Sequence, residues 1–192
     1  MKYRGQAEYA AGRESASSGM EAGDGYAPHE HLRKVDSRLI LIAPGVHQLV
    51  GDGHVWDRIA IAQYRDRMAM IEMSSNADFK ADEDHKEAGM DFTIVMATFP
   101  VDGDPLPPQQ SGADDDRLML LQVVGQVGAP DIVADVDSVR IGRFAIEDRM
   151  IGDDRTFAEA RYDLISRSVA DELAARGSTH SDTDYVVIAD PA

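Results

Sequence analysis

The chain has 192 residues, no cysteine and a formal net charge of −16 at pH 7. The lack of cysteine excludes disulfides, thiolate nucleophiles, iron–sulfur ligation and thiolate zinc sites, and the negative charge argues against binding nucleic acid or an anionic membrane surface. Apolar residues form 43% of the chain, which is enough for a packed core. Neither a signal-peptide core nor a membrane-spanning apolar run is present, so we expect a cytoplasmic protein.

The first half of the chain carries signals for a loop, followed by helices and strands. Residues 5–25 are rich in Gly, Ser, Ala and Glu, a composition that indicates a loop. We predict the other elements from proline, capping residues, turn glycines and apolar periodicity. In chain order we expect a helix over 28–35, a strand over 38–50 interrupted at Pro44-Gly45, a turn at Gly51–Gly53, a strand over 55–64, a helix over 66–73, a second helix over 76–88 that ends at Gly89, and a strand over 91–99.

The second half opens with a segment that has the composition of a linker. Residues 101–117 contain three prolines and three consecutive aspartates, which disfavour both helix and strand. Ser166 and Gly177 have the residue types that begin and end a helix. In chain order we expect a strand over 118–124, a minimal helix over 132–136, a hairpin with arms 139–150 and 156–164, a helix over 166–176, a loop around His180 and a strand over 185–189.

The two halves repeat at an offset of 101 residues without a gap. Ser37 corresponds to Ser138, and Gly51-Asp52 corresponds to Gly152-Asp153. Each half follows the order strand, helix, strand, strand, helix, strand, although only residues 1–4 could supply the first opening strand. We therefore predict an α+β protein of two tandem ferredoxin-like units, 1–100 and 118–192, joined by the linker 101–117, whose antiparallel sheets pack together as an intrachain pseudo-dimeric α+β barrel. The weak opening strand leaves a sheet edge unpaired, which predicts a homodimer or larger assembly, or else a start codon placed too far downstream.

Several motifs of the first half resemble a known family. They are Trp56-Asp57, Tyr64-Arg65-Asp66-Arg67, the stretch 73–79, the stretch 85–90 and Ala97-Thr98-Phe99-Pro100. Together they resemble the family called domain of unknown function 1330, of the dimeric α+β barrel superfamily. The likeness covers about residues 1–100, whereas residues 118–191 follow it in outline. Phe79 stands where the family pattern has Tyr, and the second half has no counterpart of His85. The resemblance implies the fold and leaves function open, because the superfamily includes cofactor-free monooxygenases, haem-degrading enzymes, isomerases and cyclases.

The alternation of side chains along the strand 55–64 indicates a ligand-binding face. One face carries Trp56, Arg58, Ala60, Ala62 and Tyr64, and small residues between aromatic ones leave a hollow. Ile59 and Ile61 lie on the opposite face, which suits packing beneath helices. The corresponding face of the second half carries Phe157, Glu159, Arg161 and Asp163. If the two sheets face each other, these residues enclose a pocket; the alternative is an open, solvated face with ordinary ion pairs. The candidate ligand-binding residues are Trp56, Phe157, Glu159 and Arg161.

Three residues are candidates for proton transfer and oxyanion stabilisation: His85, Tyr64 and Arg58. Asp82 lies one helical turn before His85 and could orient it, although Asp82 could equally pair with Lys86 on a solvated helix face. His29 and His31 diverge by about 200° on a helix, so we expect no metal site there. We expect no cofactor, and if haem were bound His85 would be the axial ligand.

These patterns favour one class of function over its rivals. No phosphate-cradling glycine motif or nucleophile elbow is present. We expect the protein to bind a small organic molecule between the two sheets. The alternatives are a cofactor-independent enzyme (a monooxygenase, isomerase or cyclase) and a catalytically silent assembly module.

Overall fold

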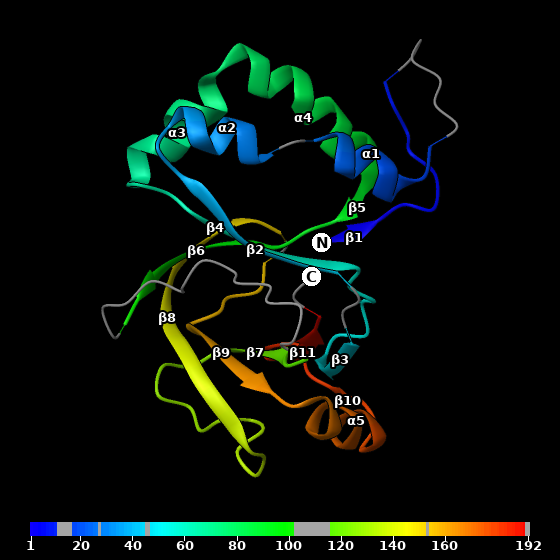
Figure 1. Ribbon diagram of the computed structural model, residues 1–192, viewed down its shortest axis with the longest axis vertical. Helices are drawn as coiled ribbons and strands as arrows, with labels where there is room; N and C mark the ends of the chain where they lie inside the picture. The colour runs from blue at the N-terminus through cyan, green and yellow to red at the C-terminus, as the bar shows by residue number, and fades with distance from the viewer. Residues whose placement is uncertain (11–16, 27, 45–46, 102–115, 153, 191–192) are drawn as a thin grey trace. The chain divides into compact units, whose positions relative to one another are not determined.

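The computed structural model describes residues 1–10, 17–26, 28–44, 47–101, 116–152 and 154–190 (Figure 1). They form helices and antiparallel sheets, so the α+β class is confirmed. The chain divides into two compact units, here named unit 1 (Met1–Ile42 and Ala60–Thr93) and unit 2 (Ala43–Ile59 and Ile94–Ala192). These units are discontinuous in sequence. The two contiguous ferredoxin-like units that the sequence predicts, 1–100 and 118–192, remain a prediction. Most of the expected linker, residues 102–115, lies outside the described residues.

The described part of unit 1 contains four helices, and capping residues explain where three of them begin. They are α1 (Gly19–Gly25), α2 (Pro28–Lys34), α3 (Arg67–Ser75) and α4 (Ala77–Gly89). The side chains of Asp66 and Asn76 accept hydrogen bonds from the first backbone N–H groups of α3 and α4, as predicted. Leu32, Ala69, Met73 and Phe79 form part of the buried core of these helices.

The helix α1 corrects the expectation of a loop over residues 5–25. Ser18 caps α1, and its side chain and that of Glu21 satisfy each other's backbone N–H groups in a capping box. The glycines that suggested a loop instead allow close packing, because Gly19 lets backbone segments approach and Gly23 makes room for the ring of Tyr3. A Cβ atom on Gly19 would overlap the carbonyl oxygens of Arg4 and Gly89.

Unit 1 also contains short strand pairs. The strand β1 (Lys2–Tyr3) pairs antiparallel with β5 (Met90–Phe92), so the short opening strand predicted from residues 1–4 is present. The strand β2 (Arg38–Pro44) pairs with β4 (Arg58–Gln63), and most residues of both belong to unit 1. The strand expected over 91–99 is divided into β5 and β6 (Val95–Pro100).

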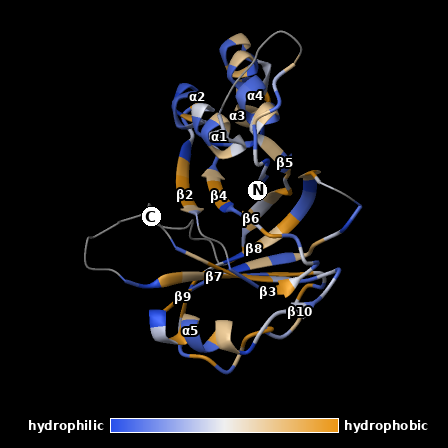
Figure 2. Cartoon of the chain, turned by 90° about the vertical axis from the view of Figure 1, so that its right-hand side faces the viewer, coloured by the Kyte–Doolittle hydropathy of each residue, from blue (hydrophilic) through white to orange (hydrophobic). Residues whose placement is uncertain are grey.

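Unit 2 is built on a seven-stranded sheet. Its strand order is β10 (Thr179–His180), β3 (His47–Gly51), β11 (Tyr185–Ala189), β7 (Leu118–Val124), β9 (Glu159–Ile165), β8 (Ser138–Ile151) and β6. Its neighbours pair antiparallel except β10 and β3, which are parallel. The helix α5 (Arg167–Ala175) lies along one side of this sheet (Figure 2). Its Leu173 packs against Leu120, Ile165 and Val186.

Two expectations for unit 2 are wrong. Residues 132–136 were expected to form a minimal helix, but the segment 125–137 contains neither helix nor strand. The strand β10 lies where a loop around His180 was expected, and it pairs with β3. The hairpin of β8 and β9 is confirmed. The prediction of a hairpin turn at Gly51–Gly53 is only partly right. The strands on either side of it do not pair with each other, because β3 pairs with β11 and β4 pairs with β2.

Elements of the two halves recur at the predicted offset of 101 residues. The strands β4 and β9 begin at Arg58 and Glu159, and a capped helix follows each of them. Gly51 and Gly152 both have positive φ angles, of 156° and 139°. None of the described helices is long and apolar enough to cross a membrane.

Candidate functional site

The two faces of the unit 2 sheet carry different side chains. Cross-strand neighbours place Gln122 opposite Arg161 and Leu120 opposite Asp163. Directly paired residues share a face. Since Leu120 packs against Leu173 of α5, these side chains lie on the side of the sheet that α5 covers, here called the α5 face. Leu121 and Tyr162 are also paired and lie on the opposite face, where Phe144 contacts Tyr162 edge to face with ring centroids 5.4 Å apart.

The α5 face carries a buried network of charged side chains. Glu159, Arg161 and Asp163 are only 2%, 4% and 1% exposed. They come from alternate positions of β9, which explains their common face. We name the whole set the charge network, and it consists of Gln122, Asp131, Arg140, Arg143, Glu159, Arg161 and Asp163.

Glu159 lies at one end of the charge network between two guanidinium groups. Its Oε1 atom accepts from Nε of Arg161 at 2.5 Å, and Arg143 donates to both of its carboxylate oxygens at 3.2 and 2.9 Å. The hydrogen bonds from Arg143 are the main cause that holds the pKa of Glu159 below its ordinary value, and those from Arg161 add to it against the opposing effect of burial. Glu159 thus remains a carboxylate at neutral pH.

Asp163 lies at the other end of the charge network and is only partly satisfied. Its Oδ1 atom accepts from Nε of Arg140 at 2.6 Å. Its Oδ2 atom is buried and has no hydrogen-bond donor among the described residues. A buried acceptor without a donor costs free energy, so this oxygen is a place where a ligand group or a water molecule would bind.

A segment without regular structure, residues 125–137, covers the charge network. Asp131 accepts from Nη1 of Arg161 at 2.8 Å and from Arg140 at 3.0 Å. The carbonyl oxygen of Ala129 accepts from Nη2 of Arg161 at 2.5 Å, and the N–H of Val133 donates to Oε1 of Gln122 at 3.1 Å. The cover is therefore attached to the sheet largely through the polar groups of the network.

The charge network is balanced, with three carboxylates and three guanidinium groups. Buried ion pairs are weak devices for stability, because the cost of removing the charges from water offsets their attraction. Buried ionisable groups beneath an irregular segment are instead a common feature of binding sites. The guanidinium and amide groups of this network can bind planar polar or anionic groups.

A second polar cluster of unit 2, here called the Asp52 cluster, centres on a nearly buried carboxylate. Oδ2 of Asp52 accepts from the hydroxyl of Tyr185 at 2.8 Å, lies 2.7 Å from Nδ1 of His54, and also accepts from Arg155. The rings of Trp56 and Phe157 lie 6.1 and 5.7 Å from that of Tyr185.

The ligand-binding residues predicted from the sequence thus fall into two separate clusters. Glu159 and Arg161 lie together in the charge network, whereas Trp56 and Phe157 flank Tyr185 in the Asp52 cluster. Ala60 and Ala62, beside which a hollow was expected, are both exposed. The opposite residues, Ile59 and Ile61, are half-buried, as is the candidate Arg58.

The candidate catalytic residues of unit 1 have different surroundings. Tyr64 packs against the helix core, and burial raises its pKa. His85 lies with Nδ1 2.6 Å from the hydroxyl of Tyr9. Asp82, which was expected to orient His85, instead lies 2.7 Å from Nε2 of His31. Asp82 pairs with His31 on α2 rather than with His85 one turn away, because His31 is buried and water cannot satisfy its ring nitrogen.

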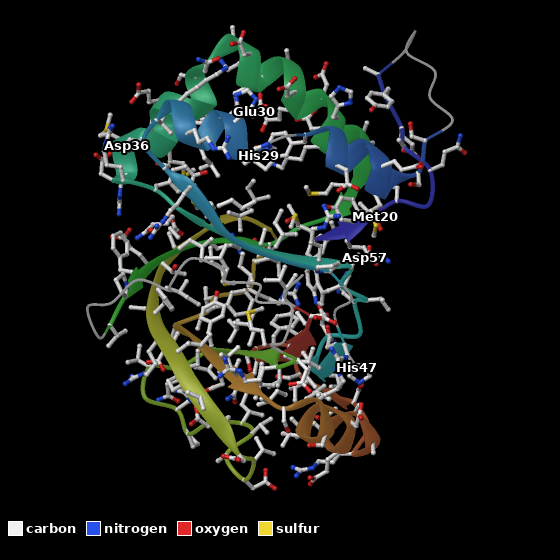
Figure 3. The ribbon with its side chains drawn as sticks, in the orientation of Figure 1. Met20, His29, Glu30, Asp36, His47 and Asp57 are labelled. Carbon is white, nitrogen blue, oxygen red and sulfur yellow. The ribbon has the colours of Figure 1, made fainter. Side chains whose placement is uncertain are left out.

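The two histidines of α2 have different surroundings. His29 is exposed on α2 (labelled in Figure 3), whereas His31 is buried, so the two diverge as the helical spacing predicts. Within the described residues no group of three or more His, Asp or Glu side chains is placed to hold a metal ion.

Sequence reasoning missed four members of the charge network: Gln122, Asp131, Arg140 and Arg143. The pairing of β8 with β9 places Arg140 opposite Asp163 and Arg143 opposite Arg161. This pairing depends on a register shift between Arg140 and Gly142, so the sequence carried no local signal for these two arginines.

No family model matches the chain, and no curated protein or solved structure shows significant similarity to it.

Proposed function

We propose that the protein binds a small organic molecule on the α5 face of unit 2, with the charge network as its polar floor. The observation that carries this proposal is the burial of Glu159, Arg161 and Asp163 beneath a segment that is not a helix. In a β-α-β-β-α-β unit a helix would cover this position. An irregular cover can move more readily than a packed helix, because fewer apolar contacts hold it.

The floor offers donors and acceptors that a ligand could use. Arg161 presents a planar guanidinium already oriented by Glu159. The amide of Gln122 and the Oδ2 atom of Asp163 are acceptors, and the second has no donor among the described residues. A few precisely placed polar groups are typical of small-molecule sites.

Native mass spectrometry of the protein purified from its own organism tests this proposal. Wild type should retain a small molecule, and Arg161→Met should lose it. Arg167→Met is the matched control, because Arg167 is exposed on α5 at 53% of its side chain. Release of the same molecule by both variants, or retention by both, would contradict a site at the charge network.

A second candidate function is proton transfer without a cofactor, and the pair of Asp52 and His54 favours it. Asp52 is positioned to orient the ring of His54, which is 46% exposed. A carboxylate that fixes an imidazole is the arrangement of many general bases. Keto–enol tautomerisation of phenylpyruvate, followed by ultraviolet absorbance, is a suitable probe. His54→Ala should reduce the rate by about 10²-fold or more, and an unchanged rate would remove this candidate.

A third candidate is assembly with a second copy of the chain. The strand β6 is the last in the order of the described sheet, and its Phe99 is 49% exposed. An edge strand with exposed apolar residues can pair with another chain. Light scattering after size exclusion should give a dimer mass, and Phe99→Lys should shift it to the monomer mass. A monomer in wild type would contradict this candidate.

We also propose the tandem ferredoxin-like arrangement and the relationship to the domain of unknown function 1330 family. The strand order β11, β7, β9, β8 in unit 2 supports it, since the last element of a β-α-β-β-α-β unit then lies beside the first. The recurrence of β4 and β9 at the offset of 101 residues supports duplication. A crystal structure in which the turns at Gly51 and Gly152 fail to superpose would contradict it.

A further inference from the structure

Asp131 occupies a position in the charge network that an external molecule could take. Its Oδ1 atom accepts from Arg161 at 2.8 Å and from Arg140 at 3.0 Å. It differs from the other two carboxylates of the network, because Glu159 and Asp163 belong to the strand β9 whereas Asp131 belongs to the irregular segment 125–137. Its side chain is 34% exposed, whereas theirs are each 2% exposed.

We propose that the ligand of this site is a small organic carboxylate, whose carboxylate group replaces that of Asp131. This inference rests on the proposed function, and names the chemical class that the site selects. Asp131 acts in it as an internal competitor that occupies the site when no ligand is bound.

The geometry of Arg161 favours a carboxylate over other groups. Its Nε atom is bound to Glu159, a partner on the same strand. Its Nη1 and Nη2 atoms are bound to Asp131 and to the carbonyl oxygen of Ala129, and both of these acceptors belong to the covering segment. Displacement of that segment would release both donors together. Two parallel N–H groups of one guanidinium match the two oxygens of a carboxylate.

Charge balance points to the same class of ligand. With Asp131 in place the network contains three carboxylates and three guanidinium groups. Withdrawal of Asp131 leaves one positive charge in excess at a site where Arg161 is 4% exposed, and an unpaired buried charge is strongly unfavourable. A monoanion restores the balance, whereas a neutral molecule or a cation does not. The formal charge of −16 further disfavours ligands of higher negative charge.

Benzoate and benzamide test this proposal, since they have the same size and differ in charge. Calorimetric titration should give binding of benzoate and none of benzamide. The apparent Kd of benzoate should be about tenfold lower for Asp131→Ala than for wild type, because the competitor is gone. Asp135→Ala is the matched control, because Asp135 lies on the same segment but pairs with Arg176 at 3.0 Å. Its Kd should equal that of wild type.

Two further variants separate the possible outcomes. Asp131→Ala combined with Arg161→Met should lose benzoate binding. If the alanine variant fails to fold, Asp131→Asn should lower the Kd in the same direction by a smaller factor. Equal binding of benzoate and benzamide, or equal Kd values for Asp131→Ala and Asp135→Ala, would overturn the inference. A copurified molecule without a carboxylate that still depends on Arg161 would overturn it while leaving the proposed function intact.

Discussion

Asp82 and His31 face each other across two helices of unit 1, with Oδ2 of the aspartate 2.7 Å from Nε2 of the histidine. His31 is 4% exposed and its ring packs edge to face on Phe79, with centroids 5.4 Å apart. Its Nδ1 atom is buried and has no partner among the described residues. Asp82 therefore satisfies one of the two polar atoms of a buried imidazole, and it joins α2 to α4.

Loss of Asp82 should destabilise the protein although the residue lies partly in solvent. Asp82→Ala leaves both ring nitrogens of His31 unsatisfied, and an unsatisfied buried polar group costs about 1–3 kcal/mol. Asp84→Ala, an exposed position on the same helix, should change the free energy of unfolding by less than about 0.5 kcal/mol. Urea denaturation measures both values, and equal losses would show that the contact with His31 contributes nothing.

The charge network predicts a dependence of stability on pH. The folded-state pKa of Glu159 lies below its ordinary value of 4.5, first because of the hydrogen bonds from Arg143. Its carboxylate therefore contributes stability that is fully present above the unfolded-state pKa and is lost as pH falls through the folded-state pKa. The free energy of unfolding of wild type should thus fall more steeply from about pH 5 to about pH 3 than that of Glu159→Gln.

Two measurements check the assignment of this acid sensitivity to Glu159. At pH 7, Glu159→Gln should be destabilised by about 3–5 kcal/mol, since Arg161 loses a charged partner in a buried place. Glu172→Gln is the control, because Glu172 is 65% exposed and pairs with Arg176 on the surface of α5. Identical pH profiles of wild type and Glu159→Gln would contradict the prediction.

The glycine contacts of unit 1 predict a steep steric cost at one position. A Cβ atom on Gly89 would overlap the carbonyl oxygen of Gly19 and lie 2.9 Å from the backbone nitrogen of Gly23. These are backbone atoms of α1, so no side-chain rotation relieves the overlap. Gly89→Ala should cost about 3 kcal/mol or more, at or above the upper end of overpacking effects. A Cβ atom on Gly5 meets nothing within 4 Å, so Gly5→Ala is the control for melting temperature.

The parts of the fold that the sequence predicted well depend on local signals. The strand over 118–124 is apolar except at Gln122, the strand over 185–189 is a continuous apolar run, and the structure has β7 and β11 at these bounds. Asp66 and Asn76 begin their helices as expected, because a cap is a contact between near neighbours. The helix α1 was missed since its glycines serve packing against Arg4 and Gly89, which lie far away in the chain.

The sequence predicted the candidate site only in part, because many of its contacts join residues that are far apart in the chain. Alternation along β9 placed Glu159 and Arg161 on one face. Their partners on β8 depend on a register shift between Arg140 and Gly142, which no local pattern shows. The contacts with Asp131 depend on the segment 125–137 being irregular, where a short helix was expected. The sequence therefore identified Glu159 and Arg161 as candidate ligand-binding residues but not the side chains that surround them.

The Asp52 cluster predicts an order among three substitutions. Asp52 is 9% exposed and accepts from Arg155 and from the hydroxyl of Tyr185. Asp52→Ala removes the negative charge that a guanidinium and a hydroxyl share and should cost about 3–5 kcal/mol. Tyr185→Phe removes one donor to a charged group and should cost about 1.5–3 kcal/mol. His54→Ala should cost less than about 1 kcal/mol, because the ring is 46% exposed and water can replace it.

The single tryptophan of the chain provides the measurement for this last prediction. Trp56 is 8% exposed, and its ring lies 6.1 Å from that of Tyr185 and 6.0 Å from that of His54. Unfolding in urea exposes the indole, so its emission should shift to longer wavelength, and the midpoints of the three variants can be compared directly. The carboxylate has the largest expected effect because it is the charged acceptor that both donors share in a nearly buried place. If His54→Ala proved the most destabilising of the three, the imidazole rather than Asp52 would be the centre of this cluster.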